Sequence, residues 1–177
     1  ICMFNEQDKG IFPFASELKE EGRGIPFVLL IHYSKAVRQR VLESPRPGVD
    51  FVFSWHGNAD LILAIVKLLE DAANADNDVF EVGVKGILLV EDSIRYYSNY
   101  LPELYKIVLT QSREFLKESL NEDQKKYRKR SRPKIFLATC LEEALAYFRK
   151  YGRNLLGVIS DVGMVVHKGD DPKTEKL

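Results

Sequence analysis

The sequence lacks net charge, long apolar runs and cysteine motifs. Lys plus Arg and Asp plus Glu both number 26, so no dominant role in binding polyanions such as nucleic acid is expected. No apolar run approaches the roughly 20 residues of a membrane span, and the start carries no secretory pattern. Cys2 and Cys140 form no CxxC or metal-ligand pattern, which favours a reducing cytoplasmic setting. Because the chain opens on Ile1 rather than methionine, we expect its natural start to lie upstream.

What the sequence does contain is an alternation of short apolar runs with amphipathic runs. The 177 residues are 45% apolar and 29% charged, a balance typical of a globular domain of ordinary size or of two small ones. Apolar runs alternating with amphipathic ones predict an α/β fold. The apolar runs are nearly continuous, as in parallel strands covered on both faces. Five strands are predicted at Pro26–Ile31, Asp50–Ser54, Gly86–Val90, Lys134–Ala138 and Leu155–Ser160.

The helices are predicted between these strands. Proline and glycine signals and capping residues bound them. The ranges are Pro13–Glu21, Ser34–Glu43, Leu61–Ala73, a long helix over Ser93–Ser131, and Leu141–Tyr151. In the last helix four apolar side chains are expected to face inward, namely Leu141, Ala144, Leu145 and Phe148.

Two polar segments stand apart from this pattern. The turn-rich stretch Asn74–Asp78 is interpreted as a linker. The basic run Lys125–Lys134 is interpreted as a solvated helix end, which the negative end of the helix dipole favours. A docking surface for an acidic partner or nucleic acid is the alternative for this run.

Three carboxylates follow two of the predicted strands. Glu91 and Asp92 come directly after Gly86–Val90, and Asp161 comes directly after Leu155–Ser160. The carboxyl ends of strands form the ligand-binding edge of a doubly wound sheet, so these groups are expected to gather there. Their mutual repulsion favours a bound cation, and Mg²⁺ is the hard cation that oxygen ligands of this kind suit. One of them could then act as a nucleophile toward a phosphoryl group. The plainer interpretation is that strands often end in acidic loop residues.

The three histidines are expected near the same edge. His32, His56 and His167 have no spacing typical of a transition-metal site. We therefore expect a partly buried, hydrogen-bonded role for His32 rather than metal ligation.

The segments ILLVEDS, IFLATCLEEAL and GVISDVGM occur in the order found in the first half of a bacterial response-regulator receiver domain, which this part of the chain resembles from about Val84 to Gly163. The resemblance implies that Glu91 and Asp92 are the family's acidic pair and that Asp161 is its phosphoacceptor. It also implies Mg²⁺ held by Glu91, Asp92, Asp161 and the Gly163 carbonyl. The sequence around ILLVEDS further resembles receiver modules attached to phosphoenolpyruvate-synthase-like proteins. The chain differs from the receiver pattern in one respect, because the segment between Gly86–Val90 and Lys134–Ala138 is much longer than usual.

The first part of the chain resembles the second half of a receiver, in a degenerate form. Its helices and strands follow the family's order. However, Ile31 and His32 stand where the family has Thr or Ser, and Ser54 and Trp55 stand where it has Lys and Pro. The hydroxyl and ammonium groups that would hold phosphoryl oxygens are therefore absent from this half.

The two halves are in reverse order for a single receiver. The opening ICMF resembles VGMV at Val162–Val165, an internal period of about 161 residues, which indicates a slice through tandem receivers. Residues 1–78 would be the back half of the first receiver and residues 79–177 the front half of the second. Together they are expected to form one flavodoxin-like unit, a doubly wound parallel five-stranded sheet. Its strand order would be circularly permuted, and the unit would be either closed within a chain or swapped between two chains.

These features predict a signalling module rather than an enzyme. Asp161 would accept a phosphoryl group from a histidine kinase or phosphotransfer protein. A non-phosphorylated pseudoreceiver that acts in protein interaction or dimerisation is the alternative. A Mg²⁺-dependent phosphatase of the haloacid-dehalogenase type is disfavoured, because such enzymes resemble this pattern but carry a second aspartate where this chain has Gly163.

Overall fold

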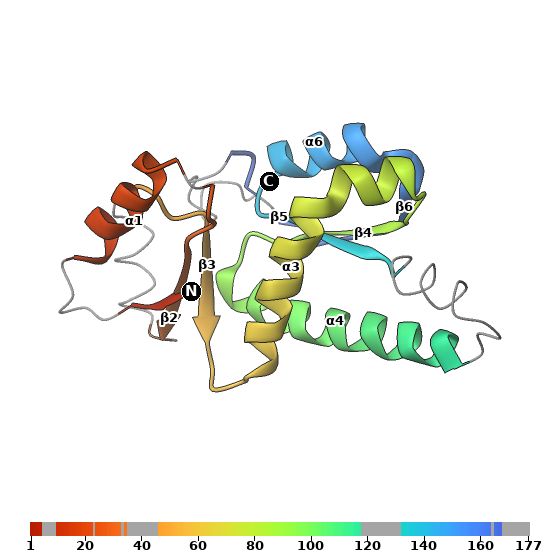
Figure 1. The fold of residues 1–177 in the computed structure, drawn as a ribbon, viewed down its shortest axis with the longest axis horizontal. Helices are drawn as coiled ribbons and strands as arrows, with labels where there is room; N and C mark the ends of the chain where they lie inside the picture. Colours follow the sequence, from red (N-terminus) through yellow and green to blue (C-terminus); the bar gives the residue numbers. More distant parts are fainter. Residues whose placement is uncertain are drawn as a thin grey trace. The chain divides into compact units, whose positions relative to one another are not determined.

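The computed structural model describes residues 1–4, 10–22, 24–32, 34, 46–117, 132–163 and 165–167. The chain is a mixed α/β protein, as predicted, and it divides into two compact units, Ile1–Ala59 and Asp60–Leu177 (Figure 1). Among the described helices, none combines the length and the apolar character that crossing a membrane requires. The helix predicted from Ser34 to Glu43 and the basic residues 125–131 lie outside the described residues, apart from Ser34.

Unit 1, Ile1–Ala59, is built on a small parallel sheet. Its strand order is β1 (Cys2–Met3), β2 (Val28–His32), β3 (Phe51–Trp55), and helix α1 spans Ile11–Glu20. The apolar residues of β2 are buried, as expected for a parallel strand covered on both faces. Asp50 ties the unit together, because its carboxylate accepts a hydrogen bond from the Phe27 amide at 2.6 Å and pairs with Lys19 at 2.7 Å.

Unit 2, Asp60–Leu177, is built on a second parallel sheet with strand order β5-β4-β6. Helix α6 lies on one face of this sheet and α4 on the other (Figure 1). The elements of the unit are α3 (Asp60–Asp76), the π-helix η1 (Asn77–Glu81), β4 (Gly86–Val90), α4 (Ile94–Lys117), β5 (Lys134–Ala138), α6 (Leu141–Tyr151), the 3₁₀ turn η2 (Gly152–Asn154) and β6 (Leu155–Ser160).

The core under α6 is aromatic. The ring of Phe136 stacks on Tyr151 with centroids 4.9 Å apart and on Tyr147 at 5.3 Å. A glycine at position 86 permits this packing, because a Cβ there would lie 2.5 Å from the Phe136 ring. These contacts hold α6 against β5, and Gly86 on the neighbouring strand β4 leaves room for the Phe136 ring.

The predicted five-stranded flavodoxin-like sheet is wrong for this structure. The two groups of neighbouring strands were predicted correctly, but β6 does not join β2. The edge of β2 that was expected to receive β6 is occupied by β1, with Cys2 beside Leu29 and Met3 beside Leu30, and by the Phe4 amide, which donates to the Leu30 carbonyl at 2.7 Å. Each unit therefore forms its own three-stranded sheet.

The polar stretch Asn74–Asp78 is not a linker. It completes α3 and begins η1, and α3 packs against α4 and β5. For this reason the compact units divide after Ala59, whereas the sequence suggested a division after residue 78.

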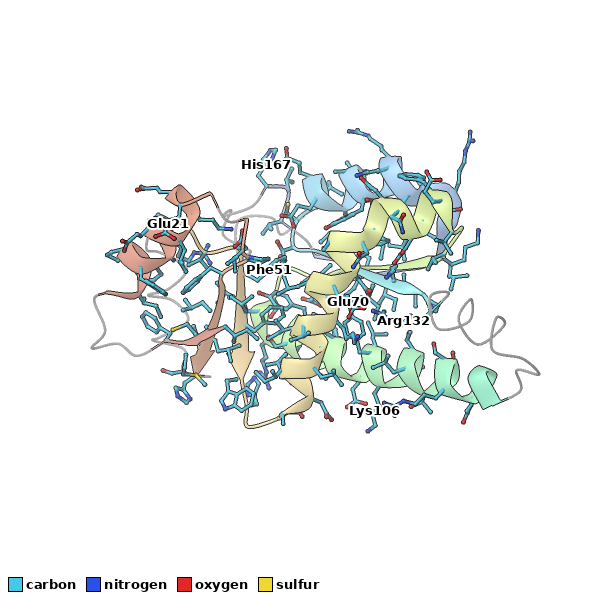
Figure 2. The ribbon with its side chains drawn as sticks, viewed as in Figure 1. Glu21, Phe51, Glu70, Lys106, Arg132 and His167 are labelled. Carbon is cyan, nitrogen blue, oxygen red and sulfur yellow. The ribbon has the colours of Figure 1, made fainter. Side chains whose placement is uncertain are left out.

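A buried carboxylate explains why α3 belongs to unit 2. Asp71 is fully buried and accepts hydrogen bonds from the Arg132 guanidinium at 2.7 and 3.1 Å and from the Tyr105 hydroxyl at 2.9 Å. It also accepts the Ile135 amide on the outer edge of β5 at 3.0 Å, and Lys134 lies 3.4 Å away. Figure 2 shows Arg132 beside Glu70, the neighbour of Asp71 on α3. Helix α3 thus closes the β5 edge, which would otherwise expose unpaired backbone groups.

The same network corrects the interpretation of the basic run. Arg132 and Lys134, its two described basic residues, are buried ion-pair partners rather than a solvated helix end. Burial lowers the pKa of Arg132, but the hydrogen bonds and charge of Asp71 outweigh this effect and raise it overall. Burial and the negative charge of Asp71 raise the pKa of Tyr105 strongly, so its hydroxyl stays protonated and can donate.

The predicted inward face of α6 is only partly correct. Ala144 is buried, but Leu141, Leu145 and Phe148 are exposed. Tyr147 and Tyr151 turn this helix toward Phe136 on β5, which leaves the other apolar flank uncovered. Strand β6 is also open, since β4 is its one partner among the described strands and Val158 is 49% exposed.

Candidate functional site

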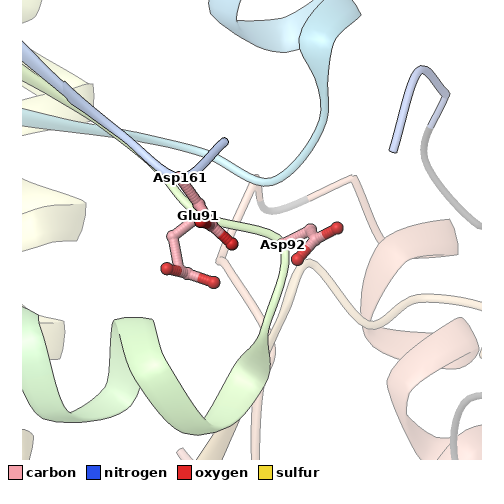
Figure 3. A group of neighbouring side chains, drawn as sticks. All are labelled: Glu91, Asp92 and Asp161. Atoms are coloured by element: carbon pink, nitrogen blue, oxygen red, sulfur yellow. The ribbon is translucent and has the colours of Figure 1, made fainter. Parts of the chain in front are cut away.

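The three predicted carboxylates come together at the carboxyl ends of β4 and β6. Parallel pairing aligns these ends, with Val90 beside Ser160, and the Asp161 amide extends the ladder by donating to the Val90 carbonyl at 3.1 Å. One carboxylate oxygen from each of Glu91, Asp92 and Asp161 lies within 4.8 Å of the others (Figure 3). The sequence prediction that two strand ends gather three acidic groups is therefore correct.

Glu91 is the buried member of this acidic trio, Glu91, Asp92 and Asp161. Its side chain points toward the start of α4 (Figure 3), and its Oε1 accepts the Ser93 amide at 3.1 Å. Burial raises the pKa of Glu91, and the negative charges of Asp161 and Asp92 raise it further, against the Ser93 hydrogen bond. A cation at this place would relieve both the repulsion and the cost of burying the charge.

Asp92 and Asp161 are more open and hold the following loop. Asp161 is exposed, and its Oδ1 accepts the amide of Val162 at 2.6 Å. Asp92 is half-buried, and its Oδ2 accepts the Val165 amide at 3.2 Å. The site thus combines one shielded carboxylate with two that solvent or a ligand can reach.

Gly163, the fourth predicted ligand, lies in the exposed part of the loop two residues beyond Asp161. A Cβ at this glycine would meet nothing within 4 Å, so its surroundings are open. Its role as a carbonyl ligand stays a prediction.

In unit 1, strand β2 ends in Ile31 and His32, and strand β3 ends in Ser54 and Trp55. Ile31 pairs with Ser54 in the register of β2 and β3, and both are buried. His32 is exposed at the end of β2, so its predicted partial burial is wrong. His56 and His167 are exposed as well, and among the described residues the acidic trio is the one group with metal-ligating geometry.

Glu91→Gln is expected to stabilise the protein at neutral pH in chelator-containing buffer. A carboxyl group whose pKa is raised by folding binds its proton more tightly in the native state, so the native protein loses stability as pH rises through the folded pKa. The variant has no charge to bury, and its amide oxygen can still accept the Ser93 amide. Denaturant titrations at pH 3.5 and pH 7 test this prediction. The gain should appear at pH 7 and shrink below the ordinary glutamate pKa of about 4.3; an equal gain at both pH values would contradict it.

Val165 takes part in the site but was not predicted from the sequence. The Val165 amide contacts the carboxylate of Asp92, but a backbone donor in a loop leaves no signal in the sequence. Only the path of the chain after β6 brings it there.

Comparisons with family models, with curated proteins and with solved structures gave no match to this chain. The resemblance to receiver domains therefore stays a prediction from the sequence motifs around Glu91, Asp92 and Asp161.

Proposed function

We propose that unit 2 is a phosphoacceptor module in which Asp161 receives a phosphoryl group while a divalent cation, Mg²⁺, is bound by the acidic trio. The observation that carries the proposal is the meeting of Glu91, Asp92 and Asp161 at adjacent strand ends, with oxygens within 4.8 Å. The three residues occupy the positions that the receiver resemblance assigns to the acidic pair and the phosphoacceptor.

The donor set fits a hard, hydrated cation. The described ligand group consists of three carboxylates and contains no histidine or cysteine. Such a group suits Mg²⁺, which binds through few protein carboxylates and keeps several waters. Glu91, Asp92 and Asp161 would hold the ion, and the Gly163 carbonyl is a fourth candidate. When bound, the ion would offset charge on the phosphoryl oxygens.

Asp161 is the member of the trio best suited to act as nucleophile, because it is exposed at the end of β6. One of its carboxylate oxygens attacks phosphorus and forms an acyl phosphate bond, while the bond from phosphorus to the donor breaks and the donor keeps the electron pair. Glu91 is buried, and one of its two carboxylate oxygens already accepts the Ser93 amide. These features suit a metal ligand rather than a nucleophile. A histidine kinase, a phosphotransfer protein or acetyl phosphate are donors of suitable chemistry.

Incubation of the chain with acetyl phosphate and Mg²⁺ tests the proposal. Intact-mass spectrometry should show a gain of one phosphoryl group that requires Mg²⁺ and disappears in Asp161→Asn. Asp60→Asn, which changes an exposed aspartate at the start of α3, is the matched control and should keep the gain. No gain, or a gain that survives Asp161→Asn, would refute the assignment.

A pseudoreceiver that acts by association is the second candidate, and the uncovered face of α6 and β6 favours it. Leu145 and Phe148 on α6 and Val158 on β6 expose apolar surface, and register with Leu88 puts Val158 on the α6 side of the sheet. Exposed apolar edge strands pair readily with further chains. A homodimer is the partner this candidate predicts.

Lysine substitution on the open strand tests the association. A Cβ at Gly157 would meet nothing within 4 Å, so Gly157→Lys should leave the fold intact while it places a charge on the open strand. If β6 mediates a dimer, sedimentation velocity should show a dimer that Gly157→Lys dissociates and that Val66→Lys, at an exposed apolar position of α3, preserves. A monomeric native chain at about 100 μM would remove this candidate.

A further inference from the structure

The loop that follows β6 returns to the sheet edge and caps a helix. The Leu141 and Glu142 amides at the start of α6 donate to the Val165 and Val166 carbonyls at 3.0 and 3.2 Å. These amides belong to the first turn of a helix, where no intrahelical carbonyl can pair them. The preceding residue, Cys140, provides no side-chain cap. The loop therefore supplies the cap that the helix sequence lacks.

The same loop is fastened to the acidic trio. The carbonyl of Val165 accepts from α6, while its amide donates to Asp92 Oδ2 at 3.2 Å, and its side chain is buried. Val165 thus connects the first turn of α6 to a carboxylate that lies within 4.8 Å of Glu91 and Asp161.

A carboxylate can serve two partners at once, because it has two oxygens. The hydrogen bond from Val165 is made to Oδ2 of Asp92 and restrains the orientation of this carboxylate, while Oδ1 can serve a second partner. Hydrogen bonds of this kind orient carboxylate ligands of metals, and losing them commonly weakens metal binding 10–100-fold.

We infer that the Val165 amide is the positioning group of Asp92, and that it couples cation binding at the acidic trio to the capping of α6. This inference rests on the cation binding of the proposed function. Cation occupancy and loop docking both require the same orientation of Asp92, so each stabilises the other. Linkage requires the two effects to be equal in magnitude.

Val165→Pro and Val165→Ala form a matched pair that tests the inference. Both replace a buried valine side chain, but only proline removes the amide hydrogen. Mn²⁺ affinity, measured by electron paramagnetic resonance, should fall at least about tenfold in Val165→Pro and stay within about twofold of native in Val165→Ala. Equal Mn²⁺ affinities in the two variants would overturn the inference.

Hydrogen exchange supplies a readout that a simple loss of packing would not change. Saturating Mg²⁺, which avoids paramagnetic broadening, should slow exchange of the Leu141 and Glu142 amides about 5-fold or more in the native chain and in Val165→Ala, and should have no effect in Val165→Pro. Cation binding without this protection in the native chain would overturn the coupling and leave the proposed function standing.

Two variants of Asp92 keep the test decisive if Val165→Pro does not fold. Asp92→Asn retains an oxygen acceptor for the Val165 amide, whereas Asp92→Ala does not. Without cation, the Leu141 and Glu142 amides should keep their protection in Asp92→Asn and lose it in Asp92→Ala; equal protection in both would overturn the inference. A native chain that binds no Mn²⁺ would refute both the inference and the proposed function. If Mn²⁺ binds and the Leu141 and Glu142 amides are protected by cation, but Asp161 gains no phosphoryl group, only the proposed function is refuted.

Discussion

Replacement of Asp71 by alanine is expected to lower the free energy of unfolding of unit 2 by about 3–5 kcal/mol, because it leaves buried charges without their partner. The fully buried carboxylate pairs with Arg132 at 2.7 Å and lies 3.4 Å from Lys134. It also accepts hydrogen bonds from Tyr105 and from the Ile135 amide on the edge of β5. Urea titration followed by far-ultraviolet circular dichroism measures the change through the transition midpoint.

Asp76→Ala is the matched control for this prediction. Asp76 lies on the same helix and pairs with Lys150 at 2.6 Å, but both side chains are more than half exposed. Exposed ion pairs contribute little to stability, so the midpoint should move far less than in the Asp71 variant. Similar losses in the two variants would show that Asp71 does not hold α3 on unit 2.

Gly48→Ala is expected to destabilise unit 1 by about 3 kcal/mol or more, since two costs add at this position. The residue has φ +77°, a conformation that favours glycine, and an added Cβ would lie 2.3 Å from the Ala15 carbonyl oxygen and 2.7 Å from the Ser16 amide nitrogen of α1. Backbone atoms in a helix cannot move aside cheaply. The single tryptophan, Trp55 on β3, reports the unfolding of this unit by its fluorescence.

Gly22→Ala separates the two costs. Gly22 has φ +68°, but an added Cβ would meet nothing within 4 Å. This variant should lose only the conformational part, about 1–2 kcal/mol. If Gly48→Ala were no more destabilising than Gly22→Ala, the close approach of the residue 48 turn to α1 would be refuted.

Local sequence signals predicted the strands and their immediate neighbours well. The five predicted strands correspond to β2, β3, β4, β5 and β6. The first four are largely buried, and buried parallel strands read as continuous apolar runs, whereas β6 is apolar but exposed. The helix predicted over Leu141–Tyr151 is correct in its bounds, but its buried face was only partly predicted. Helical periodicity locates an apolar stripe, whereas the neighbours of the helix decide which part of the stripe they cover.

The candidate site, like the helix, could be predicted in position but not in its packing. Glu91, Asp92 and Asp161 directly follow two parallel strands, and once these strands pair, geometry brings their carboxylates together. The buried state of Glu91 and the hydrogen bond from Val165 to Asp92 depend on the start of α4 and on the returning loop. Neither leaves a pattern in the residues themselves.

The amino-acid sequence was enough to predict the α/β class, five of the six described strands and the position of the acidic trio, because these depend on local hydrophobicity and on the residues that directly follow each strand. The division of the strands into two sheets follows instead from long-range packing. Cys2 and Met3, a pair too short to predict as a strand, occupy the edge of β2, and a single buried aspartate fastens α3 to β5. Neither the net charge, which is zero, nor the two cysteines indicate which strands pair. Pairing between distant strands depends on which strand edges are already covered by other parts of the folded chain.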